Sequence, residues 1–330
     1  MFSIIIPLYN KAPYIEKALH SVLTQTYKEF EIIVIDDGST DIQEALQPPK
    51  GGVKFTYSDI EQMIEGKGKL IRQKNQGVST ARNNAVKLAK YPYLCFLDAD
   101  DWWAPTFLEE MKSLIETFPK AGIYGSSYYK VKNGQHIPAN IGVEANFERG
   151  LINYCQVYAK TLWMPLWTGA VVIPKHIFEQ EQGFKPTLKL GEDFDLWIRI
   201  ALKHPVALLN KPLAYYNQDV EIENRAVNRI RRYKKEEYVT FNFDFLNEYE
   251  KSNVYLKKLL DNLRVLSLTD FRLNKFYVNE VNDVISKVDF ANVNKYYHFF
   301  YKYPLPIVRL YHRILIFGSK IKKQLNEVNS

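Results

Sequence analysis

The stretch "FSIIIPLYNKAPYIEKALHSVLTQTYKEFEIIVIDDGS", residues 2–39, decides the fold class. Two short apolar runs rich in isoleucine, 2–9 and 31–39, flank a segment in which apolar residues recur at helical spacing. Apolar runs of this length are typical of strands that are covered on both faces, and the segment between them predicts an amphipathic helix. A strand–helix–strand unit implies two parallel strands joined by a right-handed crossover.

The same alternation continues along the next part of the chain. Residues 78–90 and 105–118 have helical periodicity, and the apolar run "YLCFLDAD" (93–100) between them predicts another strand. We therefore expect an α/β fold with a mostly parallel sheet flanked by helices.

Polar side chains follow each of these three strands. They are Tyr9 and Asn10, Asp36 and Asp37, and Asp98 and Asp100. Ligands in parallel sheets bind beyond the carboxyl ends of the strands, so this convergence predicts a binding crevice. A nicotinamide or flavin site is not expected, because the turn "PLYNKAP" (7–13) lacks the glycines that such a site requires.

Asp98 and Asp100 form a D-x-D pair directly after the third predicted strand. Carboxylate oxygens suit Mg²⁺ or Mn²⁺, which are often shared with substrate phosphates. The alternative is a solvated turn in which Asp101 caps a helix. Like charges at the end of a buried strand are costly unless a cation neutralises them, which favours a metal site.

A second acidic cluster, Glu192, Asp193 and Asp195, lies at the start of a predicted helix in the segment 189–204. The helix macrodipole favours acids in a first turn, and that explanation is sufficient for Asp195. A carboxylate at the edge of a cleft is also well placed to act as a general base.

Four segments together resemble the family 2 glycosyltransferases, which are inverting, nucleotide-sugar-dependent enzymes with the GT-A fold. These segments are "SIIIPLYN…IDDGSTD" (3–41), "NQGVSTARNNAV" (75–86), "FLDADDWW" (96–103) and "LGEDFDLWIRIA" (190–201). The resemblance implies a Rossmann-like catalytic domain over residues 1–216. Residues 217–330 are expected to form a basic, mainly helical C-terminal region.

The resemblance also implies roles for individual residues. Asp193 is expected to be the catalytic base, with Glu192 supporting it. Asp100 is expected to bind Mn²⁺ or Mg²⁺, with Asp98 as a possible second ligand. The nucleotide sugar is expected to contact Pro7, Tyr9, Asn10, Asp36, Asp37, Arg82, Asn83 and Asp98.

The acceptor side is less well defined by the sequence. Candidates there are Asp101, Trp102, Trp167 and Arg225. The tryptophans suit either sugar stacking or core packing. Many members of the family have a His or Arg near the diphosphate after the last strand; here Arg225 or Arg229 is a possible substitute.

The positive charge of the chain lies in its last third. Residues 221–330 contain 20 Lys and Arg against 13 Asp and Glu, an excess of 7 that equals the net charge of the whole chain. The segment 303–324 has the pattern of a basic amphipathic helix, which predicts either peripheral contact with a membrane or packing on the catalytic domain. Nucleic-acid binding is not expected, because residues 1–220 are neutral and contain no recognition motif.

The sequence therefore predicts a metal-dependent inverting glycosyltransferase. Its donor is a nucleoside diphosphate sugar, with UDP favoured, and its acceptor is a hydroxyl of a glycan or lipid-linked glycan. Two alternatives stay open: a nucleotidyltransferase, and a non-catalytic sugar-nucleotide or glycan-binding protein. Cys95 and Cys155 lie among apolar neighbours, which predicts free thiols and a cytoplasmic location, possibly on the inner face of a membrane.

Overall fold

The computed structural model describes residues 1–42, 55–220 and 234–311. The chain divides into two compact units, Met1–Val239 and Thr240–Ser330. The first unit extends beyond residue 216, where the sequence analysis places the domain boundary. The reason is a set of backbone hydrogen bonds: Leu190 donates to Glu237, and Val239 donates back to Leu190.

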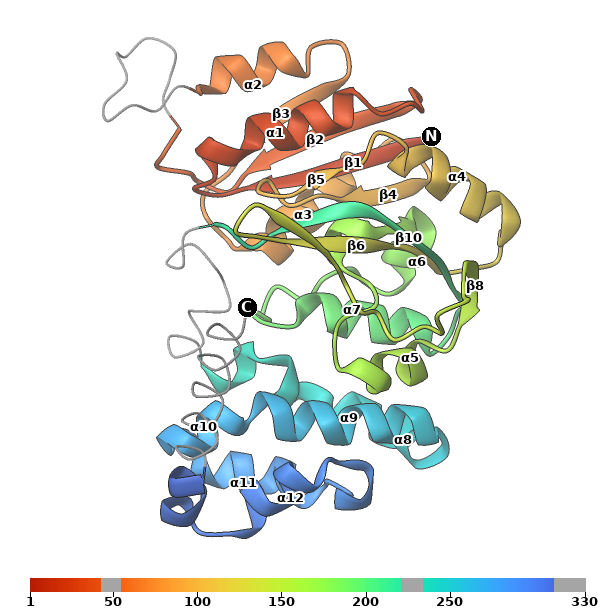
Figure 1. The fold of residues 1–330 in the computed structure, drawn as a ribbon. Helices are drawn as coiled ribbons and strands as arrows, with labels where there is room; N and C mark the ends of the chain where they lie inside the picture. The colour runs from red at the N-terminus through yellow and green to blue at the C-terminus, as the bar shows by residue number, and fades with distance from the viewer. Residues whose placement is uncertain (43–54, 221–233, 312–330) are drawn as a thin grey trace, which may run out of the picture. The chain divides into compact units, whose positions relative to one another are not determined.

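A mixed β-sheet runs through the first unit (Figure 1). Its strands lie in the order β3-β2-β1-β4-β9-β6-β10-β5, with β7 paired to β6 and β8 to β10. Their bounds are β1 Phe2–Leu8, β2 Phe30–Asp36, β3 Gly68–Arg72, β4 Tyr93–Phe96, β5 Trp102–Trp103, β6 Ile123–Lys132, β7 Gln135–Pro138, β8 Arg149–Ile152, β9 Val171–Pro174 and β10 Val206–Asn217.

The four strands β3, β2, β1 and β4 are parallel and form one half of the sheet, with β3 at its edge. Ile4 in β1 lies in register with Ile32 on one side and Cys95 on the other. All seven residues of β2 are buried. The apolar runs in the sequence therefore predict β1, β2 and β4 correctly, because strands covered on both faces lack polar alternation. The strand β3, which is partly exposed, is not among the strands expected from the sequence.

Seven helices accompany the described part of this sheet. They are α1 Ala12–Leu23, α2 Tyr57–Met63, α3 Val78–Lys87, α4 Phe107–Thr117, α5 Tyr154–Thr161, α6 Lys175–Gln180 and α7 Glu192–Ala201. The helix α1 buries Ile15, Leu19 and Val22, as its periodicity predicts. The expected helices in 78–90, 105–118 and 189–204 are present as α3, α4 and α7. Helices α4 and α7 are shorter at both ends than the segments that predict them, and α3 is shorter at its C-terminal end.

The second half of the sheet departs from the parallel pattern. Strand β9 is antiparallel to both β4 and β6, and β5 is antiparallel to β10. The sequence analysis does not anticipate these antiparallel strands. The strand β9 has four residues, which is too short for its direction to be inferred from periodicity.

The second unit is helical, as expected. Its helices are α8 Asn247–Ser252, α9 Val254–Ser267, α10 Thr269–Asn274, α11 Val278–Ser286 and α12 Lys295–Lys302. Leu256, Leu260 and Phe300 are fully buried in its core. The guanidinium of Arg264 donates two hydrogen bonds to the Glu250 carboxylate, at 2.5 and 2.9 Å.

The expected amphipathic segment 303–324 lies only partly within the described residues. Ile307, Leu310 and Tyr311 are exposed, whereas Val308 is buried. Residues 312–324 lie outside the described part of the chain. Membrane contact through this segment therefore stays a prediction, and none of the described helices has the length and apolar character that a membrane crossing requires.

Two features fix the start of α7, which carries the second acidic cluster. Gly191 has a φ of +79°, and a Cβ at this position would lie 2.3 Å from a methyl carbon of Val239, so only glycine fits. Within the helix, Asp195 is fully buried and accepts hydrogen bonds from Lys185 at 2.7 Å and from Arg199 at 2.7 and 2.9 Å. Arg199 also donates to the carbonyl oxygens of Glu181 and Gly183.

We predict that Asp195→Asn destabilises the protein by about 3 kcal/mol, because the change leaves two cations without their buried carboxylate. Urea unfolding measures this loss. The control is Glu116→Gln, which removes an exposed carboxylate paired with Lys112 and should change the free energy of unfolding by less than about 0.5 kcal/mol. Equal effects of the two substitutions would contradict a role for Asp195 in holding α7.

Candidate active site

The carboxyl ends of β2, β1 and β4 lie at the same edge of the sheet, because the three strands are parallel neighbours. Tyr9 follows β1 and is 39% exposed there. Asn10 has a φ of +51°, and its side-chain oxygen accepts a hydrogen bond from the Thr40 backbone N–H at 2.8 Å. The turn after β1 is thus tied to the turn after β2, and it presents an aromatic ring to solvent.

Asp36 and Asp37 are both buried and hold neighbouring loops in place. Asp36 accepts hydrogen bonds from the Tyr57 hydroxyl and the Ser39 backbone. Asp37 accepts three hydrogen bonds from the loop 73–77, from the Gln73 side chain and from the backbone N–H groups of residues 76 and 77. Both carboxylates therefore hold in place the loops at this edge of the sheet. Pro7 lies inside β1, opposite Ile35.

The D-x-D carboxylates each have a cationic partner. Arg82 donates to Asp98 at 2.6 Å, and Lys11 donates to Asp100 at 2.5 Å. Burial and the neighbouring Asp98 raise the pKa of Asp100, and Lys11 opposes that increase. The sequence analysis missed Lys11, although it directly follows the turn at the end of the first strand.

Arg82 connects the two acidic clusters. Its side chain is 3% exposed and donates to Glu192 at 3.2 Å as well as to Asp98. Its Nε atom is buried and has no hydrogen-bond partner among the described residues. The side chains of the D-x-D turn and of the first turn of α7 therefore belong to one site.

Burial controls the ionisation of the second cluster. Burial, followed by the charge of Asp193, raises the pKa of Glu192 to about 7, although the Arg82 guanidinium lowers it in part. Burial also raises the pKa of Asp193. The Asp193 carboxylate accepts hydrogen bonds from the Phe194 backbone at 2.7 Å and from the Thr168 hydroxyl at 3.3 Å. Thr168 is a site residue that the sequence analysis missed.

Asp101 does not cap a helix, which excludes one of the two alternatives for this residue. Helix α4 begins at Phe107, with Thr106 at its N-cap position. Asp101 is instead buried and accepts hydrogen bonds from the Trp167 indole at 3.0 Å and the Asn217 backbone at 2.8 Å. Burial and the neighbouring acids Asp100 and Asp98 raise its pKa well above the usual range.

The segment that carries Thr168 is held from both sides. The Trp167 indole binds Asp101, and the Trp103 indole donates to the Gly169 carbonyl at 2.6 Å. Since the Thr168 hydroxyl lies between these two anchors and bonds to Asp193, the D-x-D turn has a second structural connection to α7.

The remaining acceptor-side candidates differ in their surroundings. Trp103 is 3% exposed and stacks on Phe107, so it packs in the core. Trp102 is half-buried and stacks on Tyr215 with ring centroids 5.3 Å apart. The rings of Trp167 and Tyr216 lie against each other, with their centroids 4.0 Å apart. Arg225 and Arg229 lie outside the described residues.

Asn83 has a structural role in the wall of the site. Its side-chain amide donates to the Phe184 carbonyl at 2.7 Å and accepts from the Phe184 backbone N–H at 3.1 Å. This reciprocal pair satisfies the backbone of a segment 101 residues away in the sequence. Asn83 thereby fixes Phe184, whose ring lies 5.2 Å from the Arg82 guanidinium.

The donor set fits a divalent cation that shares its ligands with a substrate. Within residues 1–42, 55–220 and 234–311, no three His, Cys, Asp or Glu side chains are grouped to hold a metal ion. Asp98 and Asp100 supply two carboxylates, and Mg²⁺ or Mn²⁺ commonly takes one or two carboxylates plus phosphate oxygens and waters. The site therefore matches a cation that arrives with a phosphorylated substrate.

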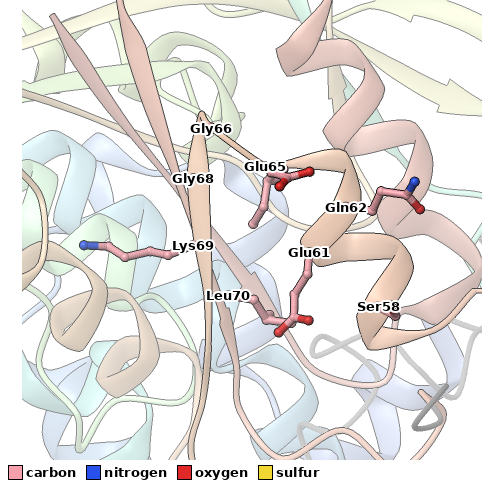
Figure 2. A pocket seen from close by; sticks show the side chains of 9 residues that line it. Ser58, Glu61, Gln62, Glu65, Gly66, Gly68, Lys69 and Leu70 are labelled. Atoms are coloured by element: carbon pink, nitrogen blue, oxygen red, sulfur yellow. The ribbon is translucent and has the colours of Figure 1, made fainter. Parts of the chain in front are cut away.

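A pocket elsewhere in the first unit lies between α2 and β3 (Figure 2). Its lining includes Glu61, Glu65, Lys69 and Leu70, and it contains none of the residues described above. We therefore do not assign it to the chemistry of the acidic clusters.

The pKa of Glu192 generates a prediction about pH and stability. Because the folded-state pKa is raised from 4.5 to about 7, the folded protein binds more protons than the unfolded chain between these values. Stability should therefore fall as the pH rises through this window. Glu192→Gln has no carboxyl group to titrate and lacks this decline. Between pH 5 and pH 8, the wild type should therefore lose up to about 3 kcal/mol more of its free energy of unfolding than the variant does. Urea unfolding between pH 5 and 8 measures the difference; parallel curves would contradict it.

Comparison with known proteins agrees with this geometry. Residues 3–162 match the family model described as "Glycosyl transferase family 2". An uncharacterized glycosyltransferase of Rickettsia felis is 33% identical over 215 residues, which cover 64% of this chain and 32% of that protein. One from Rickettsia prowazekii is 25% identical over 320 residues, which cover 89% of this chain and 93% of that protein.

The chain spans about a third of the length of the relatives from Rickettsia felis and Rickettsia conorii. Among solved structures, Staphylococcus aureus TarS 1–349 in complex with UDP-GlcNAc covers 88% of this chain, and 82% of the TarS chain is matched. Its TM-score is 0.62 at 18% sequence identity, which establishes a shared GT-A fold. The match over residues 3–162 places this part of the chain in glycosyltransferase family 2, and the solved structure of TarS agrees with it in fold.

Proposed function

We propose that this chain is an inverting, metal-dependent glycosyltransferase. It transfers a sugar from a nucleoside diphosphate sugar to a hydroxyl of a glycan or lipid-linked glycan, as in the synthesis of a polysaccharide or cell-surface glycan. One observation carries the proposal: Arg82 joins Asp98 of the D-x-D turn to Glu192, the neighbour of Asp193, in one site. A donor-binding group and a separate base are the two parts that such a transfer needs.

The donor binds at the carboxyl edge of the parallel strands. Tyr9 offers an exposed ring for stacking on the base, next to the turn that Asn10 holds in place. Asp36 and Asp37 position the loops around the nucleotide. UDP sugars are the first donors to test, since TarS, a protein of the same fold, is seen with UDP-GlcNAc.

Asp100, with Asp98 as a second ligand, holds Mn²⁺ or Mg²⁺. The ion would neutralise charge that develops on the departing diphosphate. Both carboxylates lie at the end of β4, on the same sheet edge as Tyr9.

Asp193 is the base. It accepts the proton from the acceptor hydroxyl while that oxygen forms a bond to the anomeric carbon and the bond from this carbon to the diphosphate breaks. One such displacement inverts the anomeric centre. The hydrogen bonds from Thr168 and Phe194 orient the carboxylate, and the raised pKa increases its affinity for the proton.

The acceptor lies on the Asp193 side of the site. Trp167 is a half-buried aromatic side chain of a kind that contacts sugar rings, and it directly precedes Thr168. Trp102 is also half-buried, but Tyr215 and Lys17 lie against its ring. We place the protein in the cytoplasm, with peripheral membrane contact through residues 303–324 if the acceptor is lipid-linked.

The metal role predicts a nucleotide-dependent effect of Mn²⁺. In a thermal-shift experiment, UDP with Mn²⁺ should raise the melting temperature more than either alone, because bound ligands stabilise the folded state by mass action. In Asp100→Ala, the additional rise in melting temperature that Mn²⁺ causes should be lost. Glu61→Ala, which removes an exposed carboxylate on α2, should keep it. A Mn²⁺ effect that persists in Asp100→Ala would contradict the assignment.

The base assignment predicts that Asp193→Asn lowers the rate of sugar transfer by about 10²–10⁴-fold. Its thermal shift with UDP and Mn²⁺ should stay close to that of the wild type. Equal transfer rates in the two proteins would remove Asp193 as the base. Donor binding without any turnover in either protein would favour a non-catalytic sugar-nucleotide-binding protein.

A further inference from the structure

Lys11 is the cationic partner of Asp100, and its position is set by the fold. The ammonium lies 2.5 Å from the carboxylate, and the two side chains are only 16% and 19% exposed. Lys11 directly precedes α1, and the Ala12 backbone N–H donates to Asp41 at 3.0 Å. Asn10, on its other side, is hydrogen-bonded to Ser39 and Thr40. The backbone is therefore held on both sides of Lys11, and the ammonium reaches Asp100 on a long, unbranched side chain.

The other charges in the D-x-D turn have partners that are harder to move. Arg82 is held by Asp98 and Glu192 together, at 3% exposure. Asp101 is held by an indole and a backbone N–H. Lys11, by contrast, forms its short ion pair with Asp100 on a flexible four-carbon side chain, and its charge also acts on the Asp41 carboxylate. Among these groups, Lys11 is the cation that can leave its partner at the lowest cost.

A divalent ion bound to Asp100 would compete directly with the Lys11 ammonium. The two cations repel each other at contact distance, so a metal that takes the carboxylate oxygen bonded to Lys11 displaces the lysine from it. The displaced ammonium then needs another anionic partner in a half-buried setting. The diphosphate of a donor would supply one, since lysine binds phosphate as a compact point charge.

We propose that Lys11 exchanges partners during donor binding: it neutralises Asp100 in the nucleotide-free protein and binds the diphosphate when nucleotide and metal are present. This inference rests on the proposed function. The exchange makes metal binding depend on nucleotide, because in the nucleotide-free protein the Lys11 ammonium already occupies the Asp100 carboxylate. By linkage, metal and nucleotide then strengthen each other's binding. It also places a diphosphate-binding cation within the described residues.

The test measures Mn²⁺ binding to the full chain by isothermal titration calorimetry, first without nucleotide. Lys11→Met should bind Mn²⁺ about tenfold more tightly than the wild type, because the competing ammonium is gone. Lys11→Arg keeps the charge and should stay within about twofold of the wild type. Lys17→Met removes a lysine of α1 that lies over the Trp102 ring and has no ion pair with Asp98 or Asp100 among the described residues, and it should also match the wild type.

The second part adds UDP. Wild-type protein should bind Mn²⁺ more tightly with UDP than without it, and Lys11→Met should show a smaller gain. The proposed exchange is wrong if, without nucleotide, Lys11→Met binds Mn²⁺ no more tightly than the wild type or than Lys17→Met. Thermal melting of each variant without ligands checks that it is folded. If the wild type binds no Mn²⁺ even with UDP, the metal site of the proposed function fails instead.

Discussion

Three carboxylates lie within four residues at the end of a buried strand, and the structure of the site depends on how their charges are neutralised. Burial and mutual repulsion raise the pKa of Asp100 and, more strongly, of Asp101. Such groups are costly at a buried sheet edge unless they have partners. Lys11 and Arg82, from different parts of the chain, neutralise Asp100 and Asp98, whereas Asp101 accepts hydrogen bonds from the Trp167 indole and the Asn217 backbone. The need for neutralisation therefore brings distant parts of the chain to one place.

The same requirement connects the site to α7. Arg82 binds Asp98 and Glu192, so the ionisation of the two clusters is linked through one guanidinium. The Trp167–Thr168 segment provides a separate connection, from Asp101 to Asp193. Gly191 and the buried Asp195 then fix the helix that carries Asp193. Two independent connections therefore join the D-x-D turn to the first turn of α7, where the proposed base lies.

The sequence predicts those parts of the molecule that depend on local pattern. The strands β1, β2 and β4 and the helices α1, α3, α4 and α7 follow from apolar runs and helical periodicity. The antiparallel strand β9 does not, because its direction is set by its neighbours β4 and β6. The hydrogen-bond and ion-pair partners of the acidic residues are also missed, because they are distant in the sequence. Lys11 and Asp100 are 89 residues apart in sequence, and Thr168 and Asp193 are 25 apart. Asp101 is the clearest correction, since its distant partners Trp167 and Asn217 replace the local helix cap.

The central claim is that one site contains both a donor-binding acid pair and a separate base, so that the sugar is transferred in a single inverting step. Proton NMR of the first product formed from UDP-N-acetylglucosamine or another α-linked nucleotide sugar tests this most directly. The acceptor can be a candidate glycan or water. The account predicts a β-configured product at early times, before free sugar equilibrates. An α-configured first product, or no consumption of any nucleotide sugar in a broad panel, would contradict it.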